Sequence, residues 1–249
     1  MPKTYFDKFS KYYDIIHNEK NYEIECNLIL KYSNGNNTLL DVGCGTGNHS
    51  KILSNHFNEI VGCDYSESML KIAKEKFEKF NIQNVTFTSE PLEFIKGNFD
   101  TVISMFNVIN HIESLEELIN FFREIKKKLI PGGKFIFDCW NGTACRIEPP
   151  KKNSKRFIHY DWYSLELETK TENNLFESLS NVKTNVKIYS ETEKVDEFDY
   201  EILHKLWTPD ILISVVEMVG MKIEKIFPSI FDSETAKKSD YRITFICKN

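Results

Sequence analysis

The sequence predicts an α/β fold: a seven-stranded, mostly parallel sheet with helices on both faces, plus an inserted antiparallel β-sheet. Strand-like and helix-like segments alternate through residues 1–140, and residues 144–207 then have the pattern of strands alone. A helix and two further strands follow. Crossovers between parallel strands are right-handed, so the carboxyl ends of the strands line one rim, where ligands bind.

Short apolar or β-branched runs predict the strands of the main sheet. The first run ends in a glycine-rich turn, and the second ends directly before Asp64. The expected strands are residues 39–42, 60–63, 85–87, 101–104, 134–138, 221–227 and 241–247.

Capping residues and apolar residues at helical spacing predict the helices. A short helix is expected over residues 48–55, and Ser66 can cap the next one. Ser114, with a glutamate at the right distance, has the pattern of a capping box. Pro131-Gly132-Gly133 is expected to stop that helix, and Thr208-Pro209 is expected to open the last one.

The pattern divides the chain into three regions. Residues 1–143 form a ligand-binding core with an N-terminal helical cap, and residues 208–249 complete its sheet with a helix and two strands. Residues 144–207 form three or four antiparallel strands with one wet face and no helix. The basic run over residues 151–156 is expected to be a solvated loop in preference to the alternative, a phosphate-binding patch.

Composition excludes several classes of protein. The net charge is −5 and acids are interleaved with the lysines, so no basic face for nucleic acid is expected. No apolar stretch approaches the ~20 residues of a membrane span, and the first residues lack the pattern of a signal peptide. The six cysteines are scattered without a C-x-x-C pair, which predicts a protein of the reducing cytoplasm with neither disulfides nor a metal site.

The most informative segment is Leu39-Leu40-Asp41-Val42-Gly43-Cys44-Gly45-Thr46-Gly47, a buried strand that enters a turn with glycine at every second position. Glycine lets the backbone turn sharply and lets a ligand approach bare N–H groups. Asp41, just before the turn, is expected to face the same crevice. Asp64, after the next strand, can accept hydrogen bonds from two ribose hydroxyls, although it also fits as an acid at a helix N-terminus.

Glycine spacing separates the cofactor classes. A dinucleotide site needs G-x-G-x-x-G, but here Gly47 comes one residue early and Asn48 takes the third glycine's place. A P-loop needs Gly-Lys-Ser/Thr, which does not follow. Both a nicotinamide oxidoreductase and a P-loop enzyme are therefore disfavoured.

This turn resembles the first motif of the class I S-adenosylmethionine-dependent methyltransferases. The resemblance implies a Rossmann-like fold and S-adenosyl-L-methionine as the cofactor. Residues 99–106 are similar to the fourth motif of that family, which brings the methionine half of the cofactor to the methyl acceptor.

The resemblance extends the expected cofactor site beyond the glycine turn. Tyr65 and Met69 flank the adenine, although both also fit as ordinary packing residues. Ser89 and Glu90 stand where the family often has glycine and aspartate, so their place at the adenine edge departs from the family pattern. The expected cofactor-binding residues are Tyr22, Asp41, Gly43, Cys44, Gly45, Asp64, Tyr65, Met69, Ser89, Glu90 and Met105.

Two residues are candidates for catalysis, because an amine or hydroxyl acceptor benefits from a nearby base. His111 follows the fourth strand and is expected on the rim, where a histidine that titrates near neutral pH can accept a proton. Tyr13 lies in an N-terminal segment that can cap the pocket. Each residue also has a purely structural interpretation, a loop hydrogen bond for His111 and packing for Tyr13.

The Tyr13-Asp14 pair, Asn21-Tyr22-Glu23 and His111 resemble the amino-sugar N-methyltransferases within the class. That resemblance places Tyr13 and His111 at the acceptor. It also implies that the inserted sheet covers the acceptor site and helps subunits pair as a homodimer. The expected activity is thus methyl transfer to the amine, or hydroxyl, of a small polar molecule such as a nucleotide-linked amino sugar.

Two alternatives stay open on the sequence. A nucleic-acid methyltransferase acting on base amino groups predicts an Asn/Asp-Pro-Pro-Tyr motif, whereas the fourth strand ends Ser104-Met105-Phe106-Asn107. A protein that binds the cofactor without catalysis has the same turn and the same acid.

Overall fold

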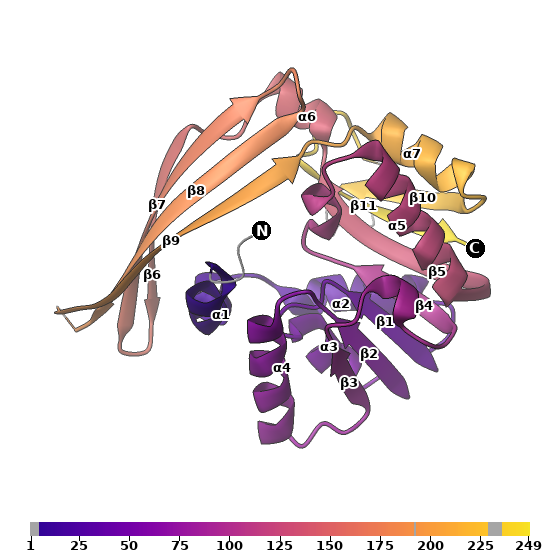
Figure 1. Cartoon of the computed structure of the whole chain (residues 1–249), viewed down its shortest axis with the longest axis horizontal. Helices are drawn as coiled ribbons and strands as arrows, with labels where there is room; N and C mark the ends of the chain where they lie inside the picture. Colours follow the sequence, from indigo (N-terminus) through magenta and orange to yellow (C-terminus); the bar gives the residue numbers. More distant parts are fainter. Residues whose placement is uncertain (1–4, 192, 229–235) are drawn as a thin grey trace.

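The computed structural model of the chain describes residues 5–191, 193–228 and 236–249. Its main body is a seven-stranded sheet in the order β10-β11-β5-β4-β1-β2-β3 (Figure 1). The pairs among β1 to β5 are parallel, whereas β11 runs antiparallel to both β5 and β10. The predicted fold class is confirmed. The strands are β1 (Thr38–Val42), β2 (Glu59–Cys63), β3 (Val85–Thr88), β4 (Phe99–Ser104), β5 (Leu129–Trp140), β10 (Lys222–Pro228) and β11 (Arg242–Lys248).

Helices cover both faces of this sheet, each above its own apolar core. Neighbouring residues of β1 point to opposite faces, so Leu40 joins one core and Leu39 the other. The first core is completed by α5 (Leu115–Lys128) and α7 (Pro209–Met218), and the second by α2 (Tyr22–Tyr32) and α3 (Asn48–Leu53). The remaining elements of the main body are α4 (Glu67–Lys79) and the short 3-10 helices η1 (Leu92–Phe94) and η2 (Val108–His111).

The predicted helix starts are confirmed. The Ser66 hydroxyl accepts a hydrogen bond from the Met69 N–H at 3.3 Å at the start of α4. Ser114 and Glu117 form the full capping box of α5. Thr208 precedes α7 with Pro209 in the first turn, but its side chain makes no capping hydrogen bond.

Pro131-Gly132-Gly133 does not end α5 as predicted. The helix ends at Lys128 and the chain enters β5 at once, so Pro131-Gly132-Gly133 lies inside the strand. The pairing of β5 with β4 jumps from Phe99↔Leu129 to Thr101↔Lys134, which leaves the proline and both glycines in a bulge. Gly132 has a φ of +80°, and its N–H donates to the carbonyl of Asn249 at 3.0 Å.

A second, four-stranded antiparallel sheet extends from the main body (Figure 1). Two expectations for this region are wrong. A short helix, α6 (Gly142–Ile147), enters it because the Asn141 side chain accepts a hydrogen bond from the Thr143 N–H. Residues 153–156 of the basic run are strand and not loop, because they pair with β7. The strands are β6 (Asn153–Tyr160), β7 (Tyr163–Asn174), β8 (Leu179–Ser190) and β9 (Glu193–Lys205).

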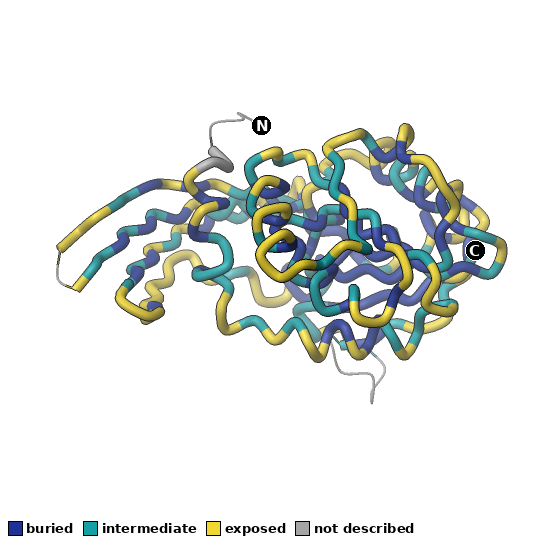
Figure 2. Tube along the Cα trace, turned by 90° about the horizontal axis from the view of Figure 1, so that it is seen from below, coloured by how far each residue is buried: buried dark blue, intermediate teal, exposed yellow. Residues whose placement is uncertain are grey.

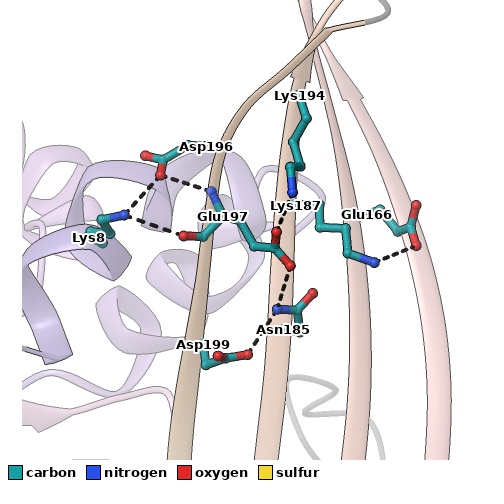
Figure 3. Close-up of polar contacts among 8 residues, drawn as sticks. All are labelled: Lys8, Glu166, Asn185, Lys187, Lys194, Asp196, Glu197 and Asp199. Atoms are coloured by element: carbon teal, nitrogen blue, oxygen red, sulfur yellow. Dashed lines mark hydrogen bonds and ion pairs between the residues drawn. The ribbon is translucent and has the colours of Figure 1, made fainter.

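The N-terminal helix α1 (Tyr5–Ile16) packs between this second sheet and α4 (Figure 1). Phe9, Tyr12 and Ile16 join Met69 of α4 and inward residues of the sheet in a third apolar core. More and less buried residues alternate along β7 and β8 of this sheet, whereas β6 is exposed except at Ile158 (Figure 2). Polar contacts hold the outer side of α1, since Lys8 and the Tyr12 hydroxyl both bind the carboxylate of Asp196 in β9, at 3.0 and 3.1 Å (Figure 3 shows the lysine).

The described helices include none that is long and apolar enough to cross a bilayer. All six cysteines are buried as free thiols, as expected for small core residues.

Candidate functional site

The strand order places β1 between β4 and β2, so the chain leaves β1 where the winding of the sheet reverses direction. The turn after β1 is the glycine-rich segment, at the carboxyl rim where ligands bind in such sheets. Gly43 has a φ of +75°, and a Cβ there would come within 2.6 Å of Cγ2 of Val108. Gly45 has a φ of +54°, but nothing lies within 4 Å of its Cβ position. The turn is therefore tight against η2 at Gly43 and open at Gly45.

Asp64 faces this open turn from the end of β2. Its carboxylate accepts a hydrogen bond from the Gly45 N–H at 2.9 Å and another from the Ser66 N–H at 2.8 Å. Burial raises the pKa of Asp64, and the two backbone hydrogen bonds act against that rise. The side chain that we expected to receive ribose hydroxyls thus also fixes the turn.

A second acid, Asp14 of α1, holds the far side of the turn. Its carboxylate accepts hydrogen bonds from the Thr46 hydroxyl at 2.7 Å and the Asn48 amide at 2.9 Å. It also forms an ion pair with Lys76 of α4 at 2.8 Å. Burial alone would raise the pKa of Asp14, but the charge of Lys76 and the three hydrogen bonds lower it overall. The N-terminal helix is thereby fastened to the glycine turn.

We expect Asp14→Asn to lower the free energy of unfolding by about 1–2 kcal/mol, the low end for charge-assisted hydrogen bonds because the carboxylate is partly exposed. The contribution is present above the ordinary pKa of 3.8 and is lost as the pH falls below it, because the folded-state pKa is lowered. Urea denaturation at several pH values measures it. The matched control is Glu75→Gln, which removes an exposed ion pair with Lys71 on the same α4 and should have almost no effect. Equal losses for both variants would contradict the network.

The predicted residue Tyr22 lies beside a buried ionic cluster of α2 and α3. Glu25 binds both Lys20 and His49, the latter at 2.6 Å. Burial opposes ionisation of Glu25, but the His49 hydrogen bond and the Lys20 charge hold its pKa at about 2. The Tyr22 ring packs on His49, and its hydroxyl is buried without a hydrogen-bond partner of normal geometry in the described part of the chain. Burial raises the pKa of Tyr22 to about 12, so the hydroxyl remains a proton donor for a ligand.

Tyr13 lies next to this group. Its pKa is raised well above the ordinary value, first by burial and then by the nearby Tyr22, Asp14 and Asp64. The Tyr13 ring contacts the ring of His17 with centroids 4.6 Å apart. The structure therefore brings Tyr13 of α1 and Tyr22 of α2 near Asp64, which follows β2. A hydroxyl whose pKa is raised stays protonated at neutral pH and can donate a hydrogen bond, and its contact with an acceptor stays a prediction.

Other predicted cofactor residues lie in less accessible places. Asp41 is buried, accepts a hydrogen bond from the Ser50 hydroxyl at 2.7 Å and so ties β1 to α3. Burial raises the pKa of Asp41. Met69 and Met105 are buried in apolar cores, so only the backbone of Met105 remains for a ligand. The Cys44 side chain is also buried, and its N–H donates to the carbonyl of Cys63.

The adenine-edge candidates are exposed. Tyr65 is 82% exposed. Ser89 and Glu90 follow β3 and are exposed as well, with the Glu90 N–H donating to the Thr88 hydroxyl. These side chains are free to close on a ligand, and their contact with adenine stays a prediction.

His111 lies at the end of η2, exposed to solvent on one side. Its ring is 5.5 Å from that of His204 in β9, which in turn stacks on Trp140 at 4.2 Å. The surrounding protein lowers the pKa of His111 by burial, so the imidazole is neutral at neutral pH and can accept a proton. The same cause lowers the pKa of His204 to about 3. Among the described residues, no direct contact joins His111 to Tyr13.

The loop between β4 and η2 carries unusual backbone. Phe106 and Asn107 are non-glycine residues with φ of +71° and +66°, a conformation that costs about 1–3 kcal/mol each and is concentrated at functional sites. The Asn107 N–H donates to the buried carboxylate of Asp138 at 2.7 Å, which stabilises the strained turn. This loop presents the Phe106 ring to His17, 5.0 Å away.

The sequence analysis did not identify several residues of this rim. They are Asp14, which binds the glycine turn, and His17, Lys20, Arg156 and Arg242. The two arginines come from β6 and β11, far apart in the sequence and in different sheets. The only signal was that Asp14 and His17 lie in the same N-terminal segment as Tyr13, Asp14 in α1 and His17 directly after it, and this did not indicate what they would touch.

Comparisons with known proteins agree with this geometry. Residues 40–137 match the family described as methyltransferase domain. An uncharacterized protein of Methanocaldococcus jannaschii is 39% identical over 140 residues, 56% of this chain and 51% of that protein. The dTDP-3-amino-3,6-dideoxy-alpha-D-glucopyranose N,N-dimethyltransferase of Streptomyces fradiae is 29% identical over 143 residues, 55% of this chain and 54% of that enzyme. The chain thus spans about half the length of these curated relatives.

A solved structure agrees over nearly the whole chain. The crystal structure of an S-adenosylmethionine-dependent methyltransferase from Clostridium acetobutylicum superposes with a TM-score of 0.80, covering 98% of each chain at 19% identity. At this identity the likeness shows the fold. This fold and the matched domain agree with the expected resemblance to class I methyltransferases.

Proposed function

We propose that this chain, whose residues 40–137 form a methyltransferase domain, transfers a methyl group from S-adenosyl-L-methionine to the amine of a small polar acceptor, or to its hydroxyl. One observation carries the proposal: the Asp64 carboxylate is fixed across an open glycine turn. A ribose needs a carboxylate in this position. The expectation of bare N–H groups in the turn is wrong for Gly43, Cys44, Gly45 and Gly47, which all donate within the protein, so the methionine end needs another donor.

The chain's residues divide the work of such a reaction. The cofactor supplies an electrophilic methyl group on a sulfonium. Asp64 is the proposed partner of the ribose. The Tyr22 hydroxyl, a buried donor with no hydrogen-bond partner of normal geometry among the described residues, is the proposed partner of the cofactor's carboxylate. Alignment of the acceptor with the methyl carbon lowers the barrier by several kcal/mol, ~7–11 at the extreme. Tyr13 is the residue that we propose to orient the acceptor by a hydrogen bond.

The acceptor must present a free lone pair, so its proton has to leave before or during transfer. Neutral His111 is our candidate to receive it. An amino sugar fits a rim that combines polar and aromatic side chains. The named activity of the Streptomyces fradiae relative is N,N-dimethylation of a nucleotide-linked amino sugar, and this supports the same acceptor class for the present chain.

Calorimetry with S-adenosylhomocysteine, the demethylated cofactor product, tests the cofactor site. We expect that compound to bind and NADH to give no heat, because Asn48 replaces the third glycine that a dinucleotide needs. A tight complex with NADH and none with S-adenosylhomocysteine would contradict the proposal. Methyl transfer is then assayed on a panel of amino sugars and small amines. Cofactor binding without transfer to any of them would favour a binding protein that has lost catalysis.

A further inference from the structure

Resting on the proposed function, we propose that the cavity between the end of α1 and the start of β11 binds an anionic group, a phosphate or a carboxylate, of the methyl acceptor. The cavity has a volume of about 360 Å³. It opens beside the strained loop at Phe106. Its lining includes His17 and Lys20 from the segment between α1 and α2, Glu25 of α2, Arg156 of β6 and Arg242 of β11.

Positive charge on one side of this cavity is not neutralised by a direct partner. Arg156 donates one hydrogen bond to the carbonyl of Ile16 at 2.8 Å, and Arg242 lies over the Phe106 ring at 5.2 Å. Neither guanidinium forms an ion pair within the described ranges of the chain. Arg156 is exposed and Arg242 is half-buried, so both can reach a ligand in the cavity. Planar guanidinium groups bind phosphate and carboxylate oxygens in pairs.

The acids near the cavity do not satisfy the arginines. Glu25 is engaged by Lys20 and His49, and Glu19 lies exposed at the rim. The carboxylate of Asp138 is buried and accepts the Asn107 N–H. The charge of Arg242 opposes the rise of its pKa, but no ion pair joins the two side chains in the described part of the chain. An anionic ligand would therefore add the hydrogen-bond partners that the guanidinium groups lack.

His17 connects this cavity to the Tyr13 side of the site. Its ring touches those of Tyr13 and Phe106 with centroids 4.6 and 5.0 Å apart. Burial lowers its pKa to about 4, assisted by the charges of Arg156, Lys20 and Arg242 and opposed by that of Asp14. An anion on the arginines offsets their charge and raises the pKa of His17 toward its ordinary value. Binding of the acceptor's anionic group and protonation of His17 are thereby coupled.

The test is calorimetry on the full chain saturated with S-adenosylhomocysteine, with inorganic pyrophosphate in one arm and succinate at equal ionic strength in the other. We expect one of these anions to bind. Arg156→Gln and Arg242→Gln should each weaken its binding by about 10-fold, and the double variant by more, as expected for charge-assisted hydrogen bonds. Binding in the pyrophosphate arm identifies a phosphate-bearing acceptor, and binding in the succinate arm a carboxylate-bearing one.

The control is Lys155→Gln, which removes the cation next to Arg156 on the same strand. Lys155 pairs with Glu166 and Glu168 on β7, so its loss should leave anion binding unchanged. Because Arg156 also anchors α1, Arg156→Lys serves as a second variant that keeps the charge and should bind more tightly than the glutamine variant. In NMR titration, the bound anion should raise the pKa of His17 in the wild type but not in the double variant.

The possible failures are distinguishable. If the wild type binds S-adenosylhomocysteine but neither anion, or if the arginine variants bind the anion as tightly as Lys155→Gln does, the anion site is overturned and the proposed function stands. If the wild type does not bind S-adenosylhomocysteine, the proposed function itself fails.

Discussion

Asp64→Asn should weaken the binding of S-adenosylhomocysteine by about 10- to 100-fold, as the loss of charge-assisted hydrogen bonds to ribose hydroxyls requires. The asparagine is similar in size, but its single acceptor oxygen cannot serve the Gly45 and Ser66 N–H groups and two hydroxyls together. Isothermal titration calorimetry measures the change. The same variant also frees the Gly45 N–H, which loosens the turn that the cofactor's other end must contact.

Asp100→Asn provides a matched control. The Asp100 carboxylate likewise accepts two hydrogen bonds, from the Thr38 N–H at 2.9 Å and its hydroxyl at 2.7 Å. It lies at the start of β4, so it is at the amino ends of the parallel strands, whereas the glycine turn follows the carboxyl end of β1. A similar loss of cofactor affinity in both variants would mean that the sheet was damaged in general and would remove Asp64 from the proposed site.

The pH dependence gives Asp64 a second test. Because burial raises its pKa, the carboxylate takes up a proton at a higher pH than an ordinary aspartate. Only the ionised form accepts hydrogen bonds from both ribose hydroxyls. Cofactor affinity of the wild type should therefore fall as the pH is lowered through this raised pKa, and the affinity of Asp64→Asn should not. A wild-type affinity independent of pH in the acid range would contradict the assignment.

The glycine turn and its acid were predictable because their signals are local. Glycine spacing sets the turn, and the strand that ends at Cys63 necessarily brings Asp64 to the same rim. The fold class followed from the alternation of elements for the same reason. Pro131-Gly132-Gly133 misled the prediction because the same residues form a stop or a bulge, and only pairing with β4 decides which.

The remaining parts of the rim depend on how distant segments pack. Arg156 appeared in a basic run that read as a solvated loop, and only the pairing of β6 with β7 turns it toward Ile16. Asp14 meets Lys76 because α1 docks on α4 through Phe9, Tyr12 and Met69. No periodicity in the sequence fixes that docking. The expected pairing of subunits through the second sheet likewise depends on how surfaces pack and not on a local sequence signal, and it stays a prediction.

The second large effect is expected at His111. His111→Asn should lower the turnover of the best acceptor by about 100-fold, within the usual range for loss of a general base, and leave the affinity for S-adenosylhomocysteine almost unchanged. The reason is that His111 ends η2 with its ring against His204 of β9, whereas the Asp64 carboxylate binds the Gly45 and Ser66 N–H groups. Steady-state kinetics with calorimetry on the same preparations separates the two quantities.

His56→Asn is the control, because His56 is an exposed histidine that follows α3 and contacts none of the proposed site residues in the described part of the structure.

The wild-type turnover should rise with pH through a pKa below the ordinary histidine value of 6.5, because burial lowers the pKa of His111 and only the neutral imidazole accepts a proton. That limb of the profile should vanish in His111→Asn. If it persists there, another group takes the proton. The candidates are then His204, whose ring contacts that of His111, and His17, which lines the cavity; both have a lowered pKa. A limb that belongs to His17 should move to higher pH when an anionic acceptor covers the arginines.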